Sequence, residues 1–221
     1  MIPAAGQGER LGAGRPKAFV DIAGECLLVH AVRGAVASGV VDTIVVAAPD
    51  GYADFVNEVL DGAGRPLSVV IGGSSRRASV AAALGALPAG VDTVLVHDAA
   101  RCLTPPDVFR AVSAGLAAGA DAVIPAIPVA DTIKDVSGDV VTRTLDRAAL
   151  RAIQTPQGFR RDVLLRAHAE TTGEASDDAS MVERLGYKVH VVPGHREAFK
   201  ITDPMGLMLA EAVLAERGSR A

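Results

Sequence analysis

Short apolar runs rich in valine and isoleucine alternate along this chain with segments of helical periodicity, and this alternation constrains the fold more than any other feature. The runs expected to be strands are Thr43–Ala48, Ser68–Ile71, Thr93–His97, Asp121–Pro125 and Lys188–Val192. Runs that are apolar throughout indicate strands buried on both faces. Strands separated by helices imply βαβ units. The pattern therefore predicts an α/β fold with a mostly parallel central sheet and helices on both faces.

Segments between and after these runs fit helices. They are Leu27–Ser38, Ala53–Leu60, Arg77–Leu87, Pro106–Ala118, Arg161–Thr171, Asp177–Leu185 and Pro204–Arg217. The chain has 221 residues, of which 49% are hydrophobic, and this is enough for one sizeable core. We therefore expect a single domain over residues 1–221. Only Met1 and Ile2 precede Pro3, so we expect the first strand to be short.

One segment departs from the alternation of strands and helices. Residues Ile133–Thr144 alternate between apolar and polar side chains on either side of Ser137-Gly138-Asp139, which is a hairpin signal. A polar hairpin inserted in a parallel α/β chain is expected to project, and its unpaired edges call for a partner. We therefore predict that residues 131–146 form a projecting arm that joins two chains in a homodimer. A simple surface excursion is the alternative.

The segment from Pro3 to Lys17 is rich in glycine and carries the cations Arg10 and Lys17. Glycines let main-chain N–H groups approach an anion, and a following helix adds its positive end. A dinucleotide fingerprint fails because Leu11 stands where its third glycine belongs, and a P-loop fails because no Gly-Lys pair follows Gly14. What remains is a polyphosphate-binding loop. An ordinary strand-to-helix turn with two surface cations is the alternative.

Further polar loops follow the predicted strands, and ligands in open α/β sheets bind beyond the carboxyl ends of strands. These loops are Gly72–Ser79, His97–Arg101 and Pro128–Lys134. Asp98 could hold a metal ion or a ribose hydroxyl, and Arg101 could hold a phosphate; a structural ion pair between the two is the alternative. We interpret His97 as structural.

Composition excludes several classes of protein. The net charge of -4, the aromatic content of 3% and the absence of tryptophan argue against a nucleic-acid binder. No basic segment followed by a long apolar run opens the chain, so neither a signal peptide nor a membrane anchor is expected. The two cysteines, Cys26 and Cys102, lack metal-site spacing. Free thiols suit a reducing compartment, so we expect a cytoplasmic protein.

Several motifs are specific in combination. They are Pro3–Lys17, His97-Asp98-Ala99-Ala100-Arg101, Asp131-Thr132-Ile133-Lys134, Thr155-Pro156-Gln157 and Lys200-Ile201-Thr202. Together they resemble the 2-C-methyl-D-erythritol 4-phosphate cytidylyltransferase (IspD) family of the non-mevalonate isoprenoid pathway. The resemblance runs from Pro3 to the helix near Glu211. It implies a Rossmann-like nucleotidyltransferase fold without the fused cyclase domain of some relatives, and transfer of CMP from CTP to methylerythritol phosphate with release of pyrophosphate.

The resemblance also implies roles for individual residues. The CTP cradle would comprise Pro3, Ala4, Ala5, Gly6 and Gly8, with Gly73 and Ser79 near the cytosine. Arg10 and Lys17 match residues that stabilise charge on the α-phosphate, and Arg147 and Lys200 match residues that position the acceptor. The remaining acceptor-binding residues would be Asp98, Ala99, Arg101, Thr132 and Ser176. Two departures stand out: Ser176 replaces a common threonine, and Ser74 replaces a common acidic residue.

This chemistry agrees with the residue types present. The acceptor phosphate is already an anion, so no serine, cysteine or strong base is needed, and positioning and electrostatics should dominate. Mg²⁺ or another divalent cation should bridge the CTP phosphates, with Asp98 as a possible protein ligand. One alternative is another sugar- or polyol-phosphate nucleotidyltransferase; Arg147, Lys200 and the hairpin argue against it. The other alternative is a non-catalytic nucleotide-binding module, against which the pair Arg10 and Lys17 argues.

Overall fold

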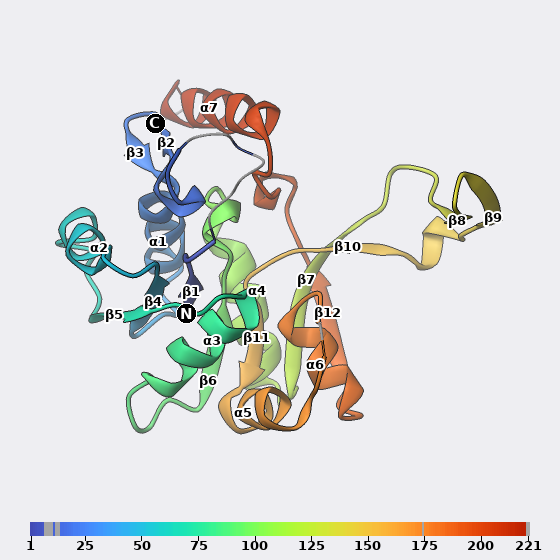
Figure 1. Ribbon diagram of the computed structural model, residues 1–221, viewed down its shortest axis with the longest axis horizontal. Helices are drawn as coiled ribbons and strands as arrows, with labels where there is room; N and C mark the ends of the chain where they lie inside the picture. The colour runs from blue at the N-terminus through green and yellow to red at the C-terminus, as the bar shows by residue number, and fades with distance from the viewer. Residues whose placement is uncertain (7–10, 12–13, 174, 220–221) are drawn as a thin grey trace.

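The computed structural model describes residues 1–6, 11, 14–173 and 175–219. Within these ranges a central layer of strands is covered by helices on both faces, and an arm projects from one side (Figure 1). The strands of the layer are β1 Ile2–Pro3, β4 Ile44–Ala48, β5 Leu67–Ile71, β6 Thr93–Val96, β7 Ala122–Pro128, β10 Arg151–Ile153, β11 Gln157–Arg160 and β12 Val189–Pro193. The predicted α/β class is confirmed.

The helices lie where the periodicity placed them, within two residues at either end. They are α1 Leu27–Ala37, α2 Ala53–Val59, α3 Arg76–Gly85, α4 Pro106–Ala117, α5 Arg161–Glu170, α6 Asp178–Arg184 and α7 Pro204–Ser219. Within the described residues, short 3-10 turns mark four connections: η2 Lys17–Phe19, η3 Ala99–Arg101, η4 Arg147–Ala149 and η5 Arg196–Ala198. Among the helices of the described ranges, none is both long and apolar enough to cross a bilayer.

The sheet combines two groups of strands. Strands β1, β4 and β5 pair in parallel in the order β1-β4-β5. The second group has the order β10-β7-β11-β6, and β12 pairs in parallel with β7. Met1 links the groups: its amino group donates to the Leu95 carbonyl at 2.7 Å, and its carbonyl accepts from His97 N at 3.0 Å. The two groups therefore form one layer.

Strand β11 was not predicted. It runs antiparallel between β6 and β7, so the sheet is parallel around β1 and mixed around β7. Its sequence, Gln157-Gly158-Phe159-Arg160, offers a single large apolar residue and therefore no apolar run. A Cβ at Gly158 would lie 2.4 Å from Cγ1 of Val112, so α4 approaches β11 too closely for any side chain there. Packing, and not strand propensity, selects this residue.

Both faces of the sheet are buried because successive side chains of a strand point to opposite faces. Val45 and Ala47 of β4 belong to a core cluster that contains side chains of α3, α5 and α6. Ile44, Val46 and Ala48 of the same strand belong to a second cluster, with side chains of α1 and α2. This two-sided burial explains why the strand sequences are apolar throughout.

A third cluster brings the C-terminal part of the chain to the first loop. Helix α7 packs beside a small hairpin, β2 Asp21–Ile22 and β3 Glu25–Cys26, that follows η2. Ile201 and Ala210 are buried there with Ile22 and Leu27. This packing fixes the segment that carries Lys200 against the small hairpin and helix α1 near the start of the chain.

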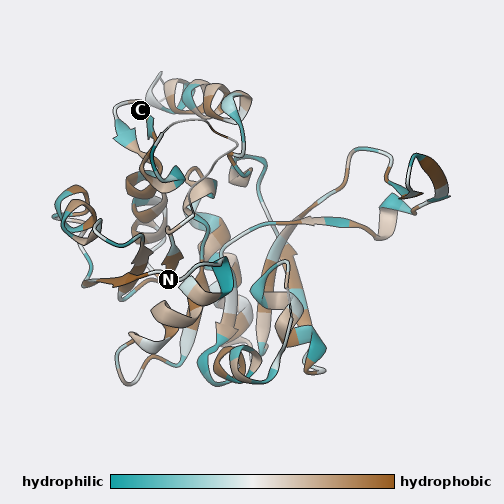
Figure 2. Ribbon diagram, in the orientation of Figure 1, coloured by the Kyte–Doolittle hydropathy of each residue, from teal (hydrophilic) through white to brown (hydrophobic). Residues whose placement is uncertain are grey.

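The arm consists of β8 Lys134–Ser137 and β9 Val140–Thr144, and it extends beyond β7 and β10 (Figure 1). Every residue of both strands is exposed. Val136, Val140 and Val141 are 62%, 63% and 54% exposed. Hydrophobic residues therefore gather at the tip of the arm (Figure 2). The predicted hairpin is confirmed, and none of the residues that the structure describes covers its three valine side chains.

Candidate active site

A cavity of about 390 Å³ opens at the carboxyl ends of β1 and β6. Its walls come from the loop after β1, the loop between β5 and α3, and η3. The described residues that line it include ten of the predicted site residues: Pro3, Ala4, Ala5, Gly6, Lys17, Gly73, Ser79, Asp98, Ala99 and Lys200. Gly8 and Arg10 lie outside the described residues. Residues far apart in the sequence thus meet in one cavity, as expected for a site at strand ends.

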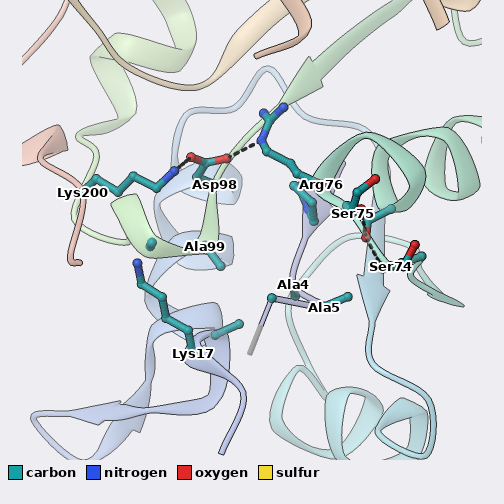
Figure 3. Close-up of a pocket in the computed structure, with 15 residues that line it drawn as sticks. Ala4, Ala5, Lys17, Ser74, Ser75, Arg76, Asp98, Ala99 and Lys200 are labelled. Atoms are coloured by element: carbon teal, nitrogen blue, oxygen red, sulfur yellow. Dashed lines mark hydrogen bonds and ion pairs between the residues drawn. The ribbon is translucent and has the colours of Figure 1, made fainter. Parts of the chain in front are cut away.

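A second cavity, of about 270 Å³, adjoins the first. Its lining comprises Arg76, Asp98, Arg101, Ile153, Gln154, Thr155, Gln157, Ser176, Asp177 and Lys200. Arg76, Asp98 and Lys200 line both cavities and therefore form their common boundary. In Figure 3, Asp98 lies between Lys200 and Arg76, and the Lys17 side chain points toward the same end of the first cavity.

The loop after β1 is closed by main-chain hydrogen bonds. Ala4 N donates to Ala47 O at 2.8 Å, and Lys17 N donates to Gly6 O at 3.2 Å. Lys17 begins the turn η2, whose Phe19 is buried and stacks on Tyr52 with ring centroids 5.0 Å apart. This anchor in the core directs the Lys17 side chain into the cavity (Figure 3).

The opposite wall is the turn from β5 into α3. A Cβ at Gly72 would lie 2.5 Å from Cβ of Ala5, so the two walls approach closely only because residue 72 is glycine. Ser75 caps α3 by accepting a hydrogen bond from Ala78 N at 3.1 Å. The Ser79 hydroxyl donates to the Ser75 carbonyl at 3.0 Å. The N-terminus of this ten-residue helix therefore faces the first cavity with its partial positive charge.

Two buried residues, Thr155 and His97, hold the main chain of Asp98 in place. Its N–H donates to the Thr155 hydroxyl at 3.1 Å, and that hydroxyl is 3.0 Å from Nδ1 of His97. Burial lowers the pKa of His97 to about 3, so the imidazole is neutral and shares an uncharged hydrogen bond with the Thr155 hydroxyl. His97 also packs on Phe109 with ring centroids 4.8 Å apart. These contacts agree with the interpretation of His97 as structural.

The Asp98 carboxylate connects two cations. Oδ2 is 2.8 Å from Nζ of Lys200, and Oδ1 accepts from Nε of Arg76 at 3.2 Å. Burial by itself would raise the pKa of Asp98, but the charges of Arg76 and Lys200 outweigh it and hold the pKa well below its usual range. Asp98 therefore stays ionised at neutral pH. Among the described residues, the ion pairs of Asp98 are with Arg76 and Lys200, so the alternative of an Asp98–Arg101 ion pair is wrong.

Arg101 has a different set of partners. Its two Nη groups donate to the carbonyls of Ala198, at 2.7 Å, and Ile153, at 3.0 Å. Burial lowers the pKa of this guanidinium, although Asp98 opposes the shift. Arg101 thus ties the turn η5, which leads to Lys200, to strand β10. It lines the second cavity while bracing the wall that carries Lys200.

Gln154 is a further brace that the sequence did not reveal. Its amide exchanges two hydrogen bonds with the main chain of His195, Nε2 to the carbonyl at 2.8 Å and Oε1 from the N–H at 3.0 Å. A Cβ at Gly194 would lie 2.2 Å from Oε1 of Gln154. Ile201 N also donates to Ala100 O at 2.9 Å. Lys200 is therefore positioned by hydrogen bonds on both sides of it in the sequence.

Thr132 and Arg147 lie outside both cavities within one chain. They stand on the two segments that lead into and out of the arm, and both are exposed. Nη1 of Arg147 donates to Ala130 O at 2.7 Å. Ser176, by contrast, lines the second cavity, beside Asp177, which caps α6 through Ser180 N at 2.9 Å.

Few side chains at the site could bind a metal ion. The described part of the chain contains no group of three or more His, Cys, Asp or Glu side chains able to hold one. Asp98 is the single carboxylate among the described residues that line the first cavity. Such a site fits an ion that takes most of its oxygen ligands from nucleotide phosphates and water, which is how Mg²⁺ commonly binds.

Comparisons with known proteins find close relatives of this chain. The sequence model of a family described as 2-C-methyl-D-erythritol 4-phosphate cytidylyltransferase (IspD) matches residues 1–216. The enzyme of that name from Streptomyces avermitilis is 53% identical, with 98% of this chain and 91% of the relative covered; the one from Rhodococcus opacus is 50% identical, with 98% and 94% covered. The crystal structure of the Thermus thermophilus enzyme superposes with a TM-score of 0.77 at 36% identity over 96% of each chain. That of the 4-diphosphocytidyl-2C-methyl-D-erythritol synthase from Anaerococcus prevotii superposes with 0.85 at 26% identity, over 97% of this chain and 96% of the other.

Proposed function

The chain belongs to the 2-C-methyl-D-erythritol 4-phosphate cytidylyltransferase (IspD) family, and we propose that its two adjoining cavities bind the two substrates of the family's reaction. The enzyme transfers CMP from CTP to 2-C-methyl-D-erythritol 4-phosphate, giving 4-diphosphocytidyl-2-C-methyl-D-erythritol and pyrophosphate in the non-mevalonate isoprenoid pathway. The first cavity binds CTP and the second binds methylerythritol phosphate. The shared boundary of Arg76, Asp98 and Lys200 carries this assignment, because the acceptor phosphate must meet the α-phosphorus between the two sites.

CTP lies along the loop after β1 with its phosphates at the main-chain N–H groups and its cytosine toward the β5–α3 turn. Pro3, Ala4, Ala5 and Gly6 form the cradle, together with Gly8. Gly73 and Ser79 lie next to the base. The small residues of both walls support this placement, because they let the main chain approach the phosphates on one side and the base on the other.

In the reaction, an oxygen of the acceptor phosphate attacks the α-phosphorus of CTP, a new P–O bond forms, and pyrophosphate leaves with its electron pair. Arg10 and Lys17 stabilise the negative charge that grows on the α-phosphate. Lys200 holds the acceptor phosphate in line, and Asp98 keeps the ammonium of Lys200 in place at 2.8 Å. No side chain needs to remove a proton, so orientation and charge account for the rate.

Asp98 and the triphosphate together would hold a magnesium ion. The ion, when bound, neutralises part of the phosphate charge. Because both Asp98 oxygens contact cations in the free protein, a direct Asp98–metal bond would replace one of these contacts. Water-mediated contact from Asp98 leaves both ion pairs intact.

The arm at residues 131–146 joins two chains of the single domain, and Thr132 and Arg147 complete the acceptor site of the partner subunit. Support comes from the absence of both residues from the linings of the two cavities within one chain, and from the exposed Val136, Val140 and Val141. Exposed apolar side chains on a projecting hairpin favour self-association.

We place the enzyme in the cytosol. Its two cysteines, Cys26 and Cys102, are free and buried, which suits a reducing compartment.

Pyrophosphate release tests the substrate assignment. The purified protein is supplied with CTP and methylerythritol phosphate, then with UTP in place of CTP, and then with other sugar phosphates in place of the acceptor. We expect release with the first pair and a loss with UTP on the order of ten-fold or more, because uracil leaves a buried polar group unpaired at a cost of about 1–3 kcal/mol. Equal kcat/KM across the acceptors would contradict the assignment of the second cavity.

A further inference from the structure

We propose that Arg76 and Asp178 are positioning residues for the transfer reaction: they fix Asp98 so that Lys200 is held at the boundary between the two cavities. Neither residue follows from the sequence motifs, and neither touches the reacting atoms in this scheme. The inference rests on the proposed role of Lys200 toward the acceptor phosphate.

A row of alternating charges carries the proposal. Oδ1 of Asp178 is 2.9 Å from Nε2 of His168, and its Oδ2 accepts from Nη1 of Arg76 at 2.6 Å. Nε of Arg76 then donates to Oδ1 of Asp98 at 3.2 Å, and Oδ2 of Asp98 is 2.8 Å from Nζ of Lys200. The row joins α5, α6, α3, the end of β6 and the segment before α7.

The two ends of this row differ in burial: Lys200, at the cavities, is its most exposed member, and Asp178 and His168, at the other end, are buried. The Lys200 side chain is 42% exposed, that of Arg76 29%, that of Asp98 11% and that of Asp178 0%. Burial would raise the pKa of Asp178, but His168 and Arg76 together hold it below its usual range, so the carboxylate is ionised where it anchors Arg76. The row therefore has a fixed inner end and an exposed outer end at the site.

Asp98 needs such an anchor because rotation about its terminal torsion is intrinsically soft. With Oδ1 held by Arg76, Oδ2 is directed at Lys200 (Figure 3). Lys200 has a long, flexible side chain, and a fixed carboxylate reduces the number of positions its ammonium can take. Arg76 can serve two carboxylates at once because its Nε and Nη1 are separate donors on one rigid plane.

The neighbouring Arg77, on the same helix, has contacts that only connect parts of the fold. Its donors go to the main-chain carbonyls of His168, Thr171 and Gly173 at the end of α5. It lines neither cavity, whereas Arg76 lines both. Arg77→Lys is therefore a matched control, since it changes the same residue type one position away and Arg77 contacts the row only at the main-chain carbonyl of His168.

Two conservative variants give the first test, read by steady-state kinetics in both substrates. We expect Arg76→Lys and Asp178→Asn each to lower kcat/KM for methylerythritol phosphate on the order of ten- to hundred-fold, the scale of a small misplacement of a reacting group. KM for CTP should stay close to the wild-type value. If both variants keep acceptor kinetics equal to those of Arg77→Lys, Arg76 and Asp178 have no positioning role.

A double-mutant cycle separates positioning from folding. Arg76→Met leaves Asp178 buried without its cation and should lower the melting temperature, and adding Asp178→Asn removes that buried charge and should raise it again. Under the proposal the double variant regains stability while its acceptor kinetics stay as poor as those of Arg76→Met. Recovery of both stability and kinetics would show that the pair only supports the fold, and would overturn the inference.

Lys200→Met, measured alongside, separates this inference from the proposed function. A large acceptor defect in Lys200→Met with normal kinetics in Arg76→Lys and Asp178→Asn overturns only the positioning role. Normal acceptor kinetics in Lys200→Met would overturn the proposed role of Lys200 itself, and the positioning inference with it. Defects in all three, confined to the acceptor, are the expected result.

Discussion

The two cavities are built in different ways. The walls of the first cavity are largely main chain and small side chains from three local segments: the loop after β1, the turn from β5 into α3, and η3. The second cavity is defined by charged and amide side chains from five parts of the chain, braced by long-range contacts such as Arg76–Asp178 and Gln154–His195. A nucleotide triphosphate can be bound by local main-chain geometry, whereas the acceptor has to be held by side chains that only the tertiary fold brings together.

The largest effect is expected on the nucleotide side of this comparison. Lys17→Met should lower kcat on the order of 10²–10³-fold, the cost of removing a preorganised donor from a transition state. KM for methylerythritol phosphate should change little, because Lys17 lines only the first cavity. Initial rates with both substrates varied would measure this split.

Arg15→Met is the matched control for Lys17→Met. Arg15 lies two residues away and forms an ion pair with Asp21 at 2.5 Å, and it lines neither cavity. Its loss should leave kcat near the wild-type value. A near-normal kcat in Lys17→Met would make the loop a passive binding element and remove the proposed division between the two cavities.

The next largest effect is expected from loss of the arm, which under the proposal brings Thr132 and Arg147 to the second cavity of the partner subunit. Deletion of Asp135–Val141 should give monomers with poor activity, because Thr132 and Arg147 would no longer reach a partner's second cavity. Sedimentation at several concentrations measures the association state. A wild-type chain that sediments as a fully active monomer is incompatible with this proposal.

Subunit mixing tests the same point with an intact fold. Lys17→Met and Arg147→Met dimers are each expected to have low activity, but a mixed dimer would pair an intact first cavity with an intact arm at one of its two sites. For random pairing in a twofold dimer, roughly a quarter of the wild-type activity should return. If mixing restores nothing, Arg147 serves its own subunit or has no role in the site.

A smaller effect is expected at the boundary. Lys200→Met should raise KM for methylerythritol phosphate about ten- to hundred-fold, since a hydrogen bond to a charged group contributes about 1.5–3 kcal/mol. KM for CTP should change far less. Lys188→Met, at an exposed lysine that lines neither cavity, is the control. An equal rise in KM for CTP and for methylerythritol phosphate would show that the two cavities do not bind the two substrates separately.

The difference between the cavities also decides how much could be predicted from the sequence. Strands β4, β5, β6, β7 and β12, the helices and the arm follow from local periodicity, and the loops of the first cavity are contiguous motifs at predicted strand ends. The short strands β2, β3 and β10 were not predicted. Strand β11 escaped because Phe159 is its only large apolar residue. Arg76 and Asp178 are 102 residues apart, and each looks like an ordinary residue of the first turn of a helix. Their contact depends on α3 and α6 starting side by side, which no local pattern encodes.

The smallest expected effect concerns the layer beneath the boundary, which both cavities share. Burial lowers the pKa of His97 to about 3, whereas an unfolded histidine has a pKa of about 6.5. Between pH 6.5 and pH 3, the unfolded chain binds a proton at His97 that the folded chain does not. The free energy of unfolding therefore falls as the pH drops through this range, and above about pH 6.5 His97 has no effect on it. At pH 5 the loss should be about 2 kcal/mol, while Asp98 stays ionised and the charges at the boundary are unchanged. Urea unfolding between pH 5 and 7 measures the slope, and His97→Asn, which keeps an acceptor for Thr155 but does not titrate, should show a shallower one. The same slope in both proteins would assign the acid sensitivity to other groups and leave His97 as a packing residue alone.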